Sequence, residues 1–244
     1  MKSNIPENTS KNTHNVVEKL LLEDKTCKKV LDIPCGAGAF THRLLTKGIE
    51  VHSSDIENIM MIENRNFMKA DMNQTLPYED STFDAIVCID GIEHIERPFD
   101  FIRECYRVLR HGGKLIISTP NIHALRSRWR WFLTGHHNKC KTPLDEKNVN
   151  PLHHINMTSY TEIRYMLHTN GLNIEKLTTN RVKLISYFYL PIVPIAYLLT
   201  KLVYDKEEKN IEQRKRNKQI IKHMFSFPLL FGETMIVKAV YVKD

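Results

Sequence analysis

Residues 29–38 read KVLDIPCGAG, and residues 39–55 continue as AFTHRLLTKGIEVHSSD. The apolar residues Val30, Leu31 and Ile33 predict a buried strand, because the run is short and stops at Pro34. Residues 40–47 then have the period of a helix, and residues 49–52 predict a second strand that leads to Asp55. Such a strand-loop-helix-strand unit ending in an acid is how an open α/β sheet holds an adenosyl ligand, with glycines that let the backbone approach it.

Two residues of this unit favour one kind of adenosyl ligand. Thr41 stands where a dinucleotide fingerprint has a third glycine, which lets the helix pack tightly beneath a pyrophosphate. Asp32 lies within the first strand, where its charge would repel a pyrophosphate and attract an ammonium group. S-Adenosylmethionine carries an ammonium and a sulfonium but no phosphate. The pattern therefore favours S-adenosylmethionine, and a nucleotide-dependent reductase is the first rival hypothesis.

Further strands follow along the chain. The helix-period segment 100–109 separates two of them, with His111-Gly112-Gly113 as its stop signal. We expect a Rossmann-like α/β fold, a seven-stranded mostly parallel sheet with helices on both faces. The remaining predicted strands are 67–72, 81–90, 114–119, 173–179 and 233–242.

Together these segments resemble the class I S-adenosylmethionine-dependent methyltransferases. The similarity covers about residues 29–119 well and residues 150–179 loosely, with the motifs in the family's order. It is closest to the small-molecule branch that includes quinone and sugar O-methyltransferases. The family usually has glycine where this chain has Pro34, whose fixed φ suits an extended turn. The matching motifs are LDIPCGAGAF (31–40), Asp55, KADM (69–72), LPYEDSTFDAIVCIDGIEHIERP (76–98) and HGGKLIIS (111–118).

The resemblance implies roles for the residues around the first loop. Asp32 is expected to face the ammonium group of the cofactor through water. Gly36 and Gly38 are expected to make room for the methionyl part. Asp55 is expected to accept hydrogen bonds from both ribose hydroxyls.

The resemblance also implies roles for residues after the third and fourth strands. Asp71 and the backbone of Met72 are expected to hold the adenine, and Ile89 and Asp90 to border the reacting sulfonium. The full expected set of cofactor-binding residues is Asp32, Pro34, Cys35, Gly36, Gly38, Asp55, Ile56, Asp71, Met72 and Ile89.

Composition limits where the protein works. The chain has 244 residues and five scattered cysteines without C-x-x-C spacing. This predicts a reducing compartment and argues against a disulfide framework or a zinc site. The polar residues 1–28 do not read as a secretory leader. We therefore expect a cytoplasmic protein.

The net charge of +7 predicts an anionic partner. Nucleic acid is not the expected one. Enzymes that methylate base amino groups resemble one another in an Asn/Asp-Pro-Pro-aromatic loop, where this chain has Asp90-Gly91-Ile92-Glu93. Cys35 lies in the first loop and does not match the cysteine of carbon-5 pyrimidine methylation.

Residues 184–200 carry no charge, and Pro191 and Pro194 interrupt them. A single membrane span is excluded if strands 173–179 and 233–242 share one sheet, because the chain must return to the side from which it left. Two hypotheses remain: kinked helices at the membrane interface, or a helical cover over the acceptor pocket. The net positive charge of residues 201–222 favours contact with an anionic membrane surface through residues 184–222.

Methyl transfer to a hydroxyl needs a base for the departing proton, and a histidine suits this role. His154 precedes a helix predicted to be capped by Thr158 or Ser159, in the region where the family places its acceptor loops. We predict His154 as the base, His153 as the reserve candidate and Asp90 as a third catalytic residue.

No metal is expected, although Asp90, Glu93 and His94 are a second candidate cluster that could hold a divalent cation. The plain interpretation of Glu93 and His94 is that they cap the helix and line the pocket.

The predicted organisation has three parts. Residues 1–28 form an N-terminal tail and first helix, residues 29–181 and 231–244 the methyltransferase domain, and residues 182–230 an apolar and basic helical insertion. The leading hypothesis is O-methylation of a small or lipid-linked acceptor, such as a sugar intermediate or a quinone-type ring, at the cytoplasmic membrane face. N- or C-methylation of another metabolite and a non-catalytic membrane adaptor are the alternatives.

Overall fold

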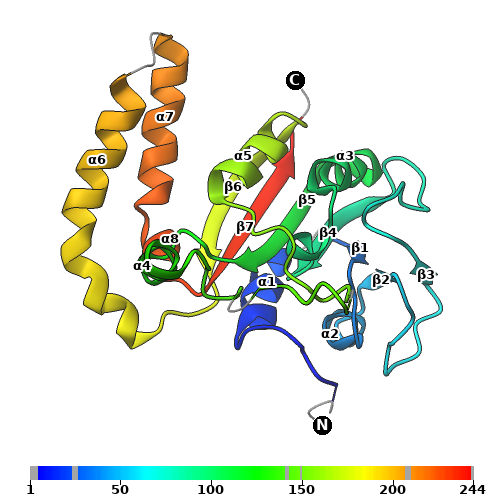
Figure 1. Ribbon diagram of the computed structural model, residues 1–244. Helices are drawn as coiled ribbons and strands as arrows, with labels where there is room; N and C mark the ends of the chain where they lie inside the picture. Colours follow the sequence, from blue (N-terminus) through cyan, green and yellow to red (C-terminus); the bar gives the residue numbers. More distant parts are fainter. Residues whose placement is uncertain (1–4, 24–26, 141–142, 149, 207–209, 243–244) are drawn as a thin grey trace.

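The chain forms one seven-stranded sheet with the order β3-β2-β1-β4-β5-β7-β6 (Figure 1). The structure is a computed structural model that describes residues 5–23, 27–140, 143–148, 150–206 and 210–242. β7 runs antiparallel to β5 and β6, and the other neighbouring strands are parallel, so the predicted mostly parallel sheet is confirmed. The strands are β1 (Lys29–Asp32), β2 (Glu50–Asp55), β3 (Phe67–Lys69), β4 (Phe83–Ile89), β5 (Leu109–Pro120), β6 (Leu172–Thr179) and β7 (Thr234–Tyr241).

Parts of each of the three predicted regions lie outside the described residues. These are residues 1–4 and 24–26 of the tail, 141–142, 149 and 243–244 of the methyltransferase domain, and 207–209 of the insertion.

Two predicted boundaries are wrong. The third strand ends at Lys69 instead of residue 72, because it pairs only with the last three residues of β2. The motif His111-Gly112-Gly113 lies inside β5, not between a helix and a strand. It forms a bulge there, since Leu109 pairs with Phe83 whereas Lys114 pairs with Ala85.

Helices cover both faces of the sheet, as predicted. Val30 of β1 packs on one face with residues of α1 and α2, and its neighbour Leu31 packs on the other face with residues of α3 and α5. Consecutive strand residues point to opposite faces, so the adjacent apolar residues Val30 and Leu31 are explained by a strand buried on both sides. These helices are α1 (Thr13–Leu22), α2 (Ala39–Leu45), α3 (Pro98–Val108) and α5 (Tyr160–His168).

Between β6 and β7 the chain forms the predicted helical insertion. α6 and α7 lie beside each other and stand away from the sheet (Figure 1). Pro191 lies within η2 and Pro194 in the first turn of α6, so the apolar segment is broken near the prolines as expected. The insertion consists of η2 (Leu184–Ile192), α6 (Val193–Lys206), α7 (Ile211–Met224) and α8 (Phe227–Phe231).

Among the described residues, Leu184–Tyr204 is one segment long and apolar enough to cross a membrane, but only 6% of its apolar window is buried. Thr179 of β6 pairs with Met235 of β7, so the chain leaves and rejoins the sheet at neighbouring positions. A single crossing is therefore excluded. Most of the large apolar side chains of this segment are exposed, so little of it packs against the sheet.

Candidate active site

The glycine loop after β1 is joined to the end of β2 by Asp55. Oδ2 of Asp55 accepts the backbone N–H of Gly36 at 2.9 Å, and Oδ1 accepts that of Ile56 at 2.8 Å. Gly36 has a φ of +50°, and a Cβ built there would meet nothing within 4 Å. A left-handed residue beside open space permits a ligand to approach the backbone closely. The structure thus brings Gly36, Asp55 and Ile56 together at the carboxyl end of the sheet.

Gly38 lies against side chains of the segment that follows β2. A Cβ at Gly38 would lie 2.9 Å from Cε of Met60 and 3.0 Å from Cγ1 of Ile62. The N–H of Met61 donates to the carbonyl of Ala37 at 3.0 Å. The segment after β2 therefore folds onto the glycine loop, and the role of Gly38 beside a methionyl group stays a prediction.

Asp32 is almost fully buried, with 1% of its surface exposed. The hydroxyl of Thr41 on α2 donates to its Oδ2 at 2.6 Å and lies 2.8 Å from Oγ of Ser53 on β2. Burial raises the pKa of Asp32 to about 7, although hydrogen bonds from Thr41 act in the opposite direction. Thr41, which the sequence marked only as a missing glycine, connects three elements through this network. Contact between Asp32 and an ammonium group stays a prediction.

Pro34 and Cys35 shape the loop. A Cβ at Gly91 would lie 2.4 Å from Cδ of Pro34, so the loop after β1 packs directly on the loop after β4. Cys35 is buried and its N–H donates to the carbonyl of Ser54 at 2.9 Å. Burial raises the pKa of its thiol far above the usual value, which argues against a nucleophilic role.

The residues expected at the adenine follow β3. Asp71 is half-buried, and its Oδ1 accepts the N–H of Asn73 at 2.8 Å. The side chain of Met72 belongs to the hydrophobic core. Ala70 donates its N–H to the carbonyl of Asp55 at 2.9 Å, which keeps this segment next to the expected ribose ligand. Adenine binding by Asp71 and Met72 stays a prediction.

Asp90 follows Ile89 at the end of β4 in a left-handed conformation, with a φ of +47°. Its Oδ1 accepts the hydroxyl of Ser118 on β5 at 2.7 Å, and its Oδ2 accepts the hydroxyl of Thr9 at 2.5 Å. Strained residues held by several bonds are typical of functional sites. The segment before α1 therefore reaches the end of β4, a contact that the sequence analysis missed.

A second group of polar side chains lies beyond the end of β4. Glu93 and His94 come from η1 (Ile92–His94), and the predicted base His154 comes from the segment before α5. The ring centroids of His94 and His154 are 4.8 Å apart, edge to face. Glu93 is buried, and its Oε2 accepts the hydroxyl of Thr119 at 3.0 Å. Oε1 of Glu93 and Nδ1 of His154 are buried and have no hydrogen-bond partner within the described protein. Two unsatisfied polar atoms at one place are expected where a substrate or ion completes the site.

The electrostatics of this group suit proton transfer. Burial, and next the charge of Asp90, raise the pKa of Glu93 to about 8. Burial, and next the positive charge of His94, lower the pKa of His154 below its ordinary value. His154 is therefore neutral at pH 7 and able to accept a proton.

The structure groups two members of the candidate cation cluster with a different third residue. Among the described residues, one ligand atom each from Glu93, His94 and His154 lies within 4.8 Å of the others, whereas Asp90 is not part of the group. Asp90 bonds to Thr9 and Ser118 instead. A carboxylate and two imidazoles have the chemistry of a divalent-cation site as well as of a proton relay.

His153 contacts the group through its backbone, whereas His154 contributes its side chain. The backbone carbonyl of His153 lies 3.0 Å from Nδ1 of His94, which orients that ring. This contact needs no side chain at position 153. The structure therefore favours His154 over His153 as the group that touches an acceptor, while its catalytic role stays a prediction.

The chain matches the model of a methyltransferase domain over residues 31–117. It is 30% identical over 107 residues to the ubiquinone biosynthesis O-methyltransferase of Pseudomonas savastanoi pv. phaseolicola, which covers 38% of this chain and 45% of that protein. The chain thus spans less than half the length of the curated relatives it matches.

Solved structures share the fold over nearly the whole chain. A putative methyltransferase from Bacillus halodurans has a TM-score of 0.57 at 15% identity and covers 95% of this chain and 99% of its own. A SAM-dependent methyltransferase from Archaeoglobus fulgidus has a TM-score of 0.52 at 23% identity and covers 93% and 94%. At these identities the likeness concerns the fold.

Proposed function

This chain carries a class I S-adenosylmethionine-dependent methyltransferase domain, and from that premise we propose that it transfers a methyl group to a hydroxyl of a small or lipid-linked acceptor at a membrane surface. The observation that carries the proposal is that two groups lie at the carboxyl edge of the sheet, on the loops after β1 and β4, which pack on each other at Pro34 and Gly91. Asp55 closes the glycine loop, and His154 with Glu93 lies beyond the end of β4. One group fits the methyl donor and the other fits the removal of a proton.

The residues of the first group fit this cofactor. Gly36 adjoins open space, and each carboxylate oxygen of Asp55 retains a lone pair beside its one backbone bond. None of the ten expected cofactor-binding residues is a lysine or arginine, as a pyrophosphate would favour. When bound, S-adenosylmethionine supplies an electrophilic methyl group on a sulfonium.

The second group would prepare the acceptor. His154 takes the proton of the acceptor hydroxyl as the oxygen attacks the methyl carbon, and the carbon–sulfur bond breaks to leave S-adenosylhomocysteine. Holding oxygen, carbon and sulfur in line is the main contribution to the rate. Asp90 and Glu93, both from the loop after β4, would form the wall of the site next to His154.

Three kinds of alternative differ in what they bind or do. A nucleotide-dependent reductase should bind a nicotinamide dinucleotide in a titration, and we expect binding of S-adenosylmethionine only. A non-catalytic membrane adaptor should release no S-adenosylhomocysteine in the presence of a membrane extract, where we expect turnover. An N- or C-methyltransferase should turn over as well, and mass spectrometry of the product identifies the methylated atom.

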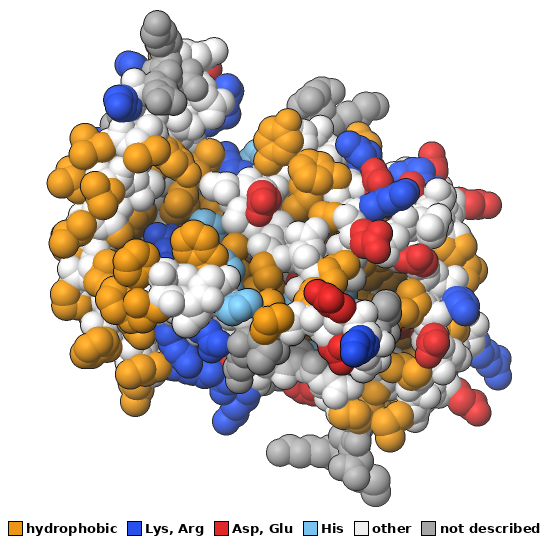
Figure 2. All heavy atoms as spheres, in the orientation of Figure 1, with side chains coloured by type: hydrophobic (Ala, Val, Ile, Leu, Met, Phe, Trp, Pro, Cys, Tyr) orange, Lys and Arg blue, Asp and Glu red, His pale blue; other side chains and the backbone are white. Residues whose placement is uncertain are grey.

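Exposed apolar side chains support the membrane part of the proposal. Phe132 of α4 (Leu125–Thr134) is 74% exposed, and Phe188 of η2 is 77% exposed. η2 contacts both α4 and α6. Figure 2 shows hydrophobic side chains gathered over α6 and around α4, with Lys and Arg side chains next to them. Patches of this kind beside basic residues favour an anionic lipid surface over water.

Asp32 makes the affinity for the cofactor depend on pH. Burial raises the pKa of Asp32 to about 7, so its carboxyl is mostly neutral below that pH and negative above it. Attraction to an ammonium group needs the negative form. We expect the affinity for S-adenosylmethionine to increase about 10-fold between about pH 5.5 and pH 7.5. Calorimetric titration should show a flat profile for Asp32→Asn, and an equal slope in both proteins would refute the role of Asp32.

Charge reversal on α7 tests the membrane contact. Arg214, Lys215 and Arg216 lie on α7 beside α6. Each cation near an anionic surface contributes about 1 kcal/mol, so changing all three to glutamate should reduce binding to phosphatidylglycerol vesicles by about 100-fold or more. Co-sedimentation measures the bound fraction.

The control for this experiment changes exposed cations elsewhere. Lys19 on α1 and Lys69 at the end of β3, both replaced by glutamate, should leave vesicle binding within about 3-fold of the wild type. If the α7 variant and this control lose binding equally, only overall charge matters and the proposed surface is wrong.

A further inference from the structure

A cavity of about 130 Å³ lies beyond the carboxyl end of β5. Its walls come from the start of α4, the start of η2 and the connection from α8 to β7, with Asn121, Ser186 and Glu233 among the lining residues. This volume has room for a compact polar group such as a phosphate.

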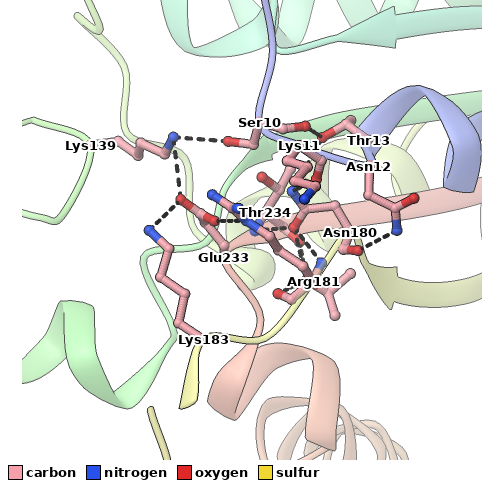
Figure 3. A network of polar contacts seen from close by, with 11 residues as sticks. Ser10, Lys11, Asn12, Thr13, Lys139, Asn180, Arg181, Lys183, Glu233 and Thr234 are labelled. Atoms are coloured by element: carbon pink, nitrogen blue, oxygen red, sulfur yellow. Dashed lines mark hydrogen bonds and ion pairs between the residues drawn. The ribbon is translucent and has the colours of Figure 1, made fainter. Parts of the chain in front are cut away.

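The walls of the cavity are strongly basic. Among the residues that the structure describes, Arg126, Lys139 and Lys183 line it together with a single carboxylate, Glu233. Nζ of Lys183 donates to Glu233 at 2.9 Å, Nζ of Lys139 lies 3.7 Å from it, and Arg181 donates to its other oxygen (Figure 3). One negative charge therefore faces several positive ones.

Glu233 is ionised, but its one negative charge does not neutralise all the positive charges around the cavity. Burial alone would raise its pKa, but hydrogen bonds from Arg181 and Lys183 outweigh burial and lower the pKa to about 2. Among the described residues no ion pair is formed by Arg126. Its guanidinium is thus available, in a cavity wall, for the planar two-oxygen contact that arginine makes with phosphate.

Helix α4 and η2, which form two of the cavity walls, carry apolar side chains on their exposed surface. The ring centroids of Trp129 on α4 and Tyr189 on η2 are 6.5 Å apart, so the two elements pack together. Leu184 and Phe188 of η2 are exposed, as is Phe132 of α4. A ligand with an anionic head and an apolar chain matches this combination.

The cavity also adjoins the proposed catalytic group. Pro120 lines it, and the preceding Thr119 donates to Glu93 at 3.0 Å. Met157 lines it as well, three residues after His154. Lys139, from its wall, is hydrogen-bonded to Ser10 at 2.9 Å, next to the Thr9 that holds Asp90. A group bound in the cavity would therefore lie beside the atoms that accept the proton.

We propose that this cavity binds the phosphate or diphosphate group of a lipid-linked acceptor and so positions the acceptor's hydroxyl at His154. The inference rests on the proposed function and names the acceptor's class. Arg126 and Lys183 bind the phosphate oxygens, Lys139 lies between this site and the catalytic group, and the lipid chain lies along η2 and α4.

The test uses the full-length protein and farnesyl diphosphate as probe, in calorimetric titrations. We expect the wild type to bind farnesyl diphosphate at least about 10-fold more tightly than farnesol or inorganic pyrophosphate, since both the head and the chain contribute. Arg126→Ala should weaken this binding by about 10- to 100-fold, and Arg126→Lys by less, because loss of a charge-assisted pair removes about 1.5–3 kcal/mol. Lys19→Ala, which removes an exposed cation on α1, should change nothing.

Three results would overturn the inference. Equal affinities for farnesyl diphosphate and farnesol exclude a phosphate site. Equal affinities for farnesyl diphosphate and pyrophosphate indicate a site for free phosphate. Displacement of farnesyl diphosphate by a short-chain, soluble phosphatidylglycerol assigns the cavity to a membrane headgroup. A parallel titration with S-adenosylmethionine and a turnover assay separate this inference from its premise. Loss of farnesyl diphosphate binding while the cofactor binds and turns over overturns the inference alone, and absence of cofactor binding or of turnover overturns the proposed function.

Discussion

Replacing Asp55 by alanine should weaken the binding of S-adenosylmethionine by about 100-fold or more. Two expected hydrogen bonds from ribose hydroxyls to a carboxylate are lost, and bonds to charged groups contribute about 1.5–3 kcal/mol each. The backbone N–H groups of Gly36 and Ile56 also lose their acceptor, which loosens the glycine loop. Calorimetric titration of the purified variant measures the change in dissociation constant.

Glu57→Ala is the matched control, because Glu57 is an exposed acid two residues further along the same segment. Its affinity for the cofactor should stay within about 2-fold of the wild type. Thermal unfolding without cofactor shows whether either variant is folded. A folded Asp55→Ala protein that binds the cofactor as tightly as the wild type would disprove the ribose role.

Replacing His154 by alanine should lower kcat by about 100-fold or more while the affinity for S-adenosylmethionine is unchanged. A positioned general base contributes about 10²- to 10⁴-fold, and the cofactor is expected on the other side of the site. Because burial lowers the pKa of His154, wild-type kcat should be retained slightly below pH 6.5 before protonation of the ring reduces it. The variant should lack this acid limb.

His153→Ala decides between the two neighbouring histidines. Its contact with His94 is made by the backbone, so kcat should remain within about 3-fold of the wild type. The reverse pattern, with loss of activity only in His153→Ala, would move the base to His153. Inhibition by a chelator in both proteins, restored by Mg²⁺ or Mn²⁺, would indicate that Glu93, His94 and His154 hold a cation.

The sheet could be predicted from sequence because its signals are local. Val30, Leu31 and Ile33 are apolar since β1 is buried on both faces, and Gly36 and Asp55 mark the following turn and strand end. The bulge at His111-Gly112-Gly113 was missed because glycines read equally well as a helix stop. Pairing with β4 keeps the flanking residues of this motif in one strand.

The site was predicted in composition but not in arrangement. Acids and histidines could be selected by position, yet their partners come from distant segments. The hydroxyl of Thr9 donates a hydrogen bond to Asp90, 81 residues away in the chain. The hydroxyl of Thr119 donates one to Glu93, 26 residues away. In the sequence, Thr41 was noted only because it stands where a dinucleotide fingerprint has a glycine. In the structure, its hydroxyl donates a hydrogen bond to the buried Asp32. No periodicity or spacing signals such contacts.

The insertion shows the same limit. Its apolar character and its break at two prolines were visible in the sequence. Which elements it contacts was not, and the basic cavity arises only because η2 and α4 pack together beside β7. Lys183 and Arg126 lie far apart in the chain, so no local motif joins them.

The most direct test follows the methyl group itself. Protein incubated with S-adenosylmethionine labelled in its methyl group, together with a membrane lipid extract, should transfer label into the organic phase, and Asp55→Ala and His154→Ala should abolish this transfer. Label that remains entirely on the cofactor, although the cofactor is bound, would contradict the account. Label recovered only in nucleic acid or protein would contradict it as well.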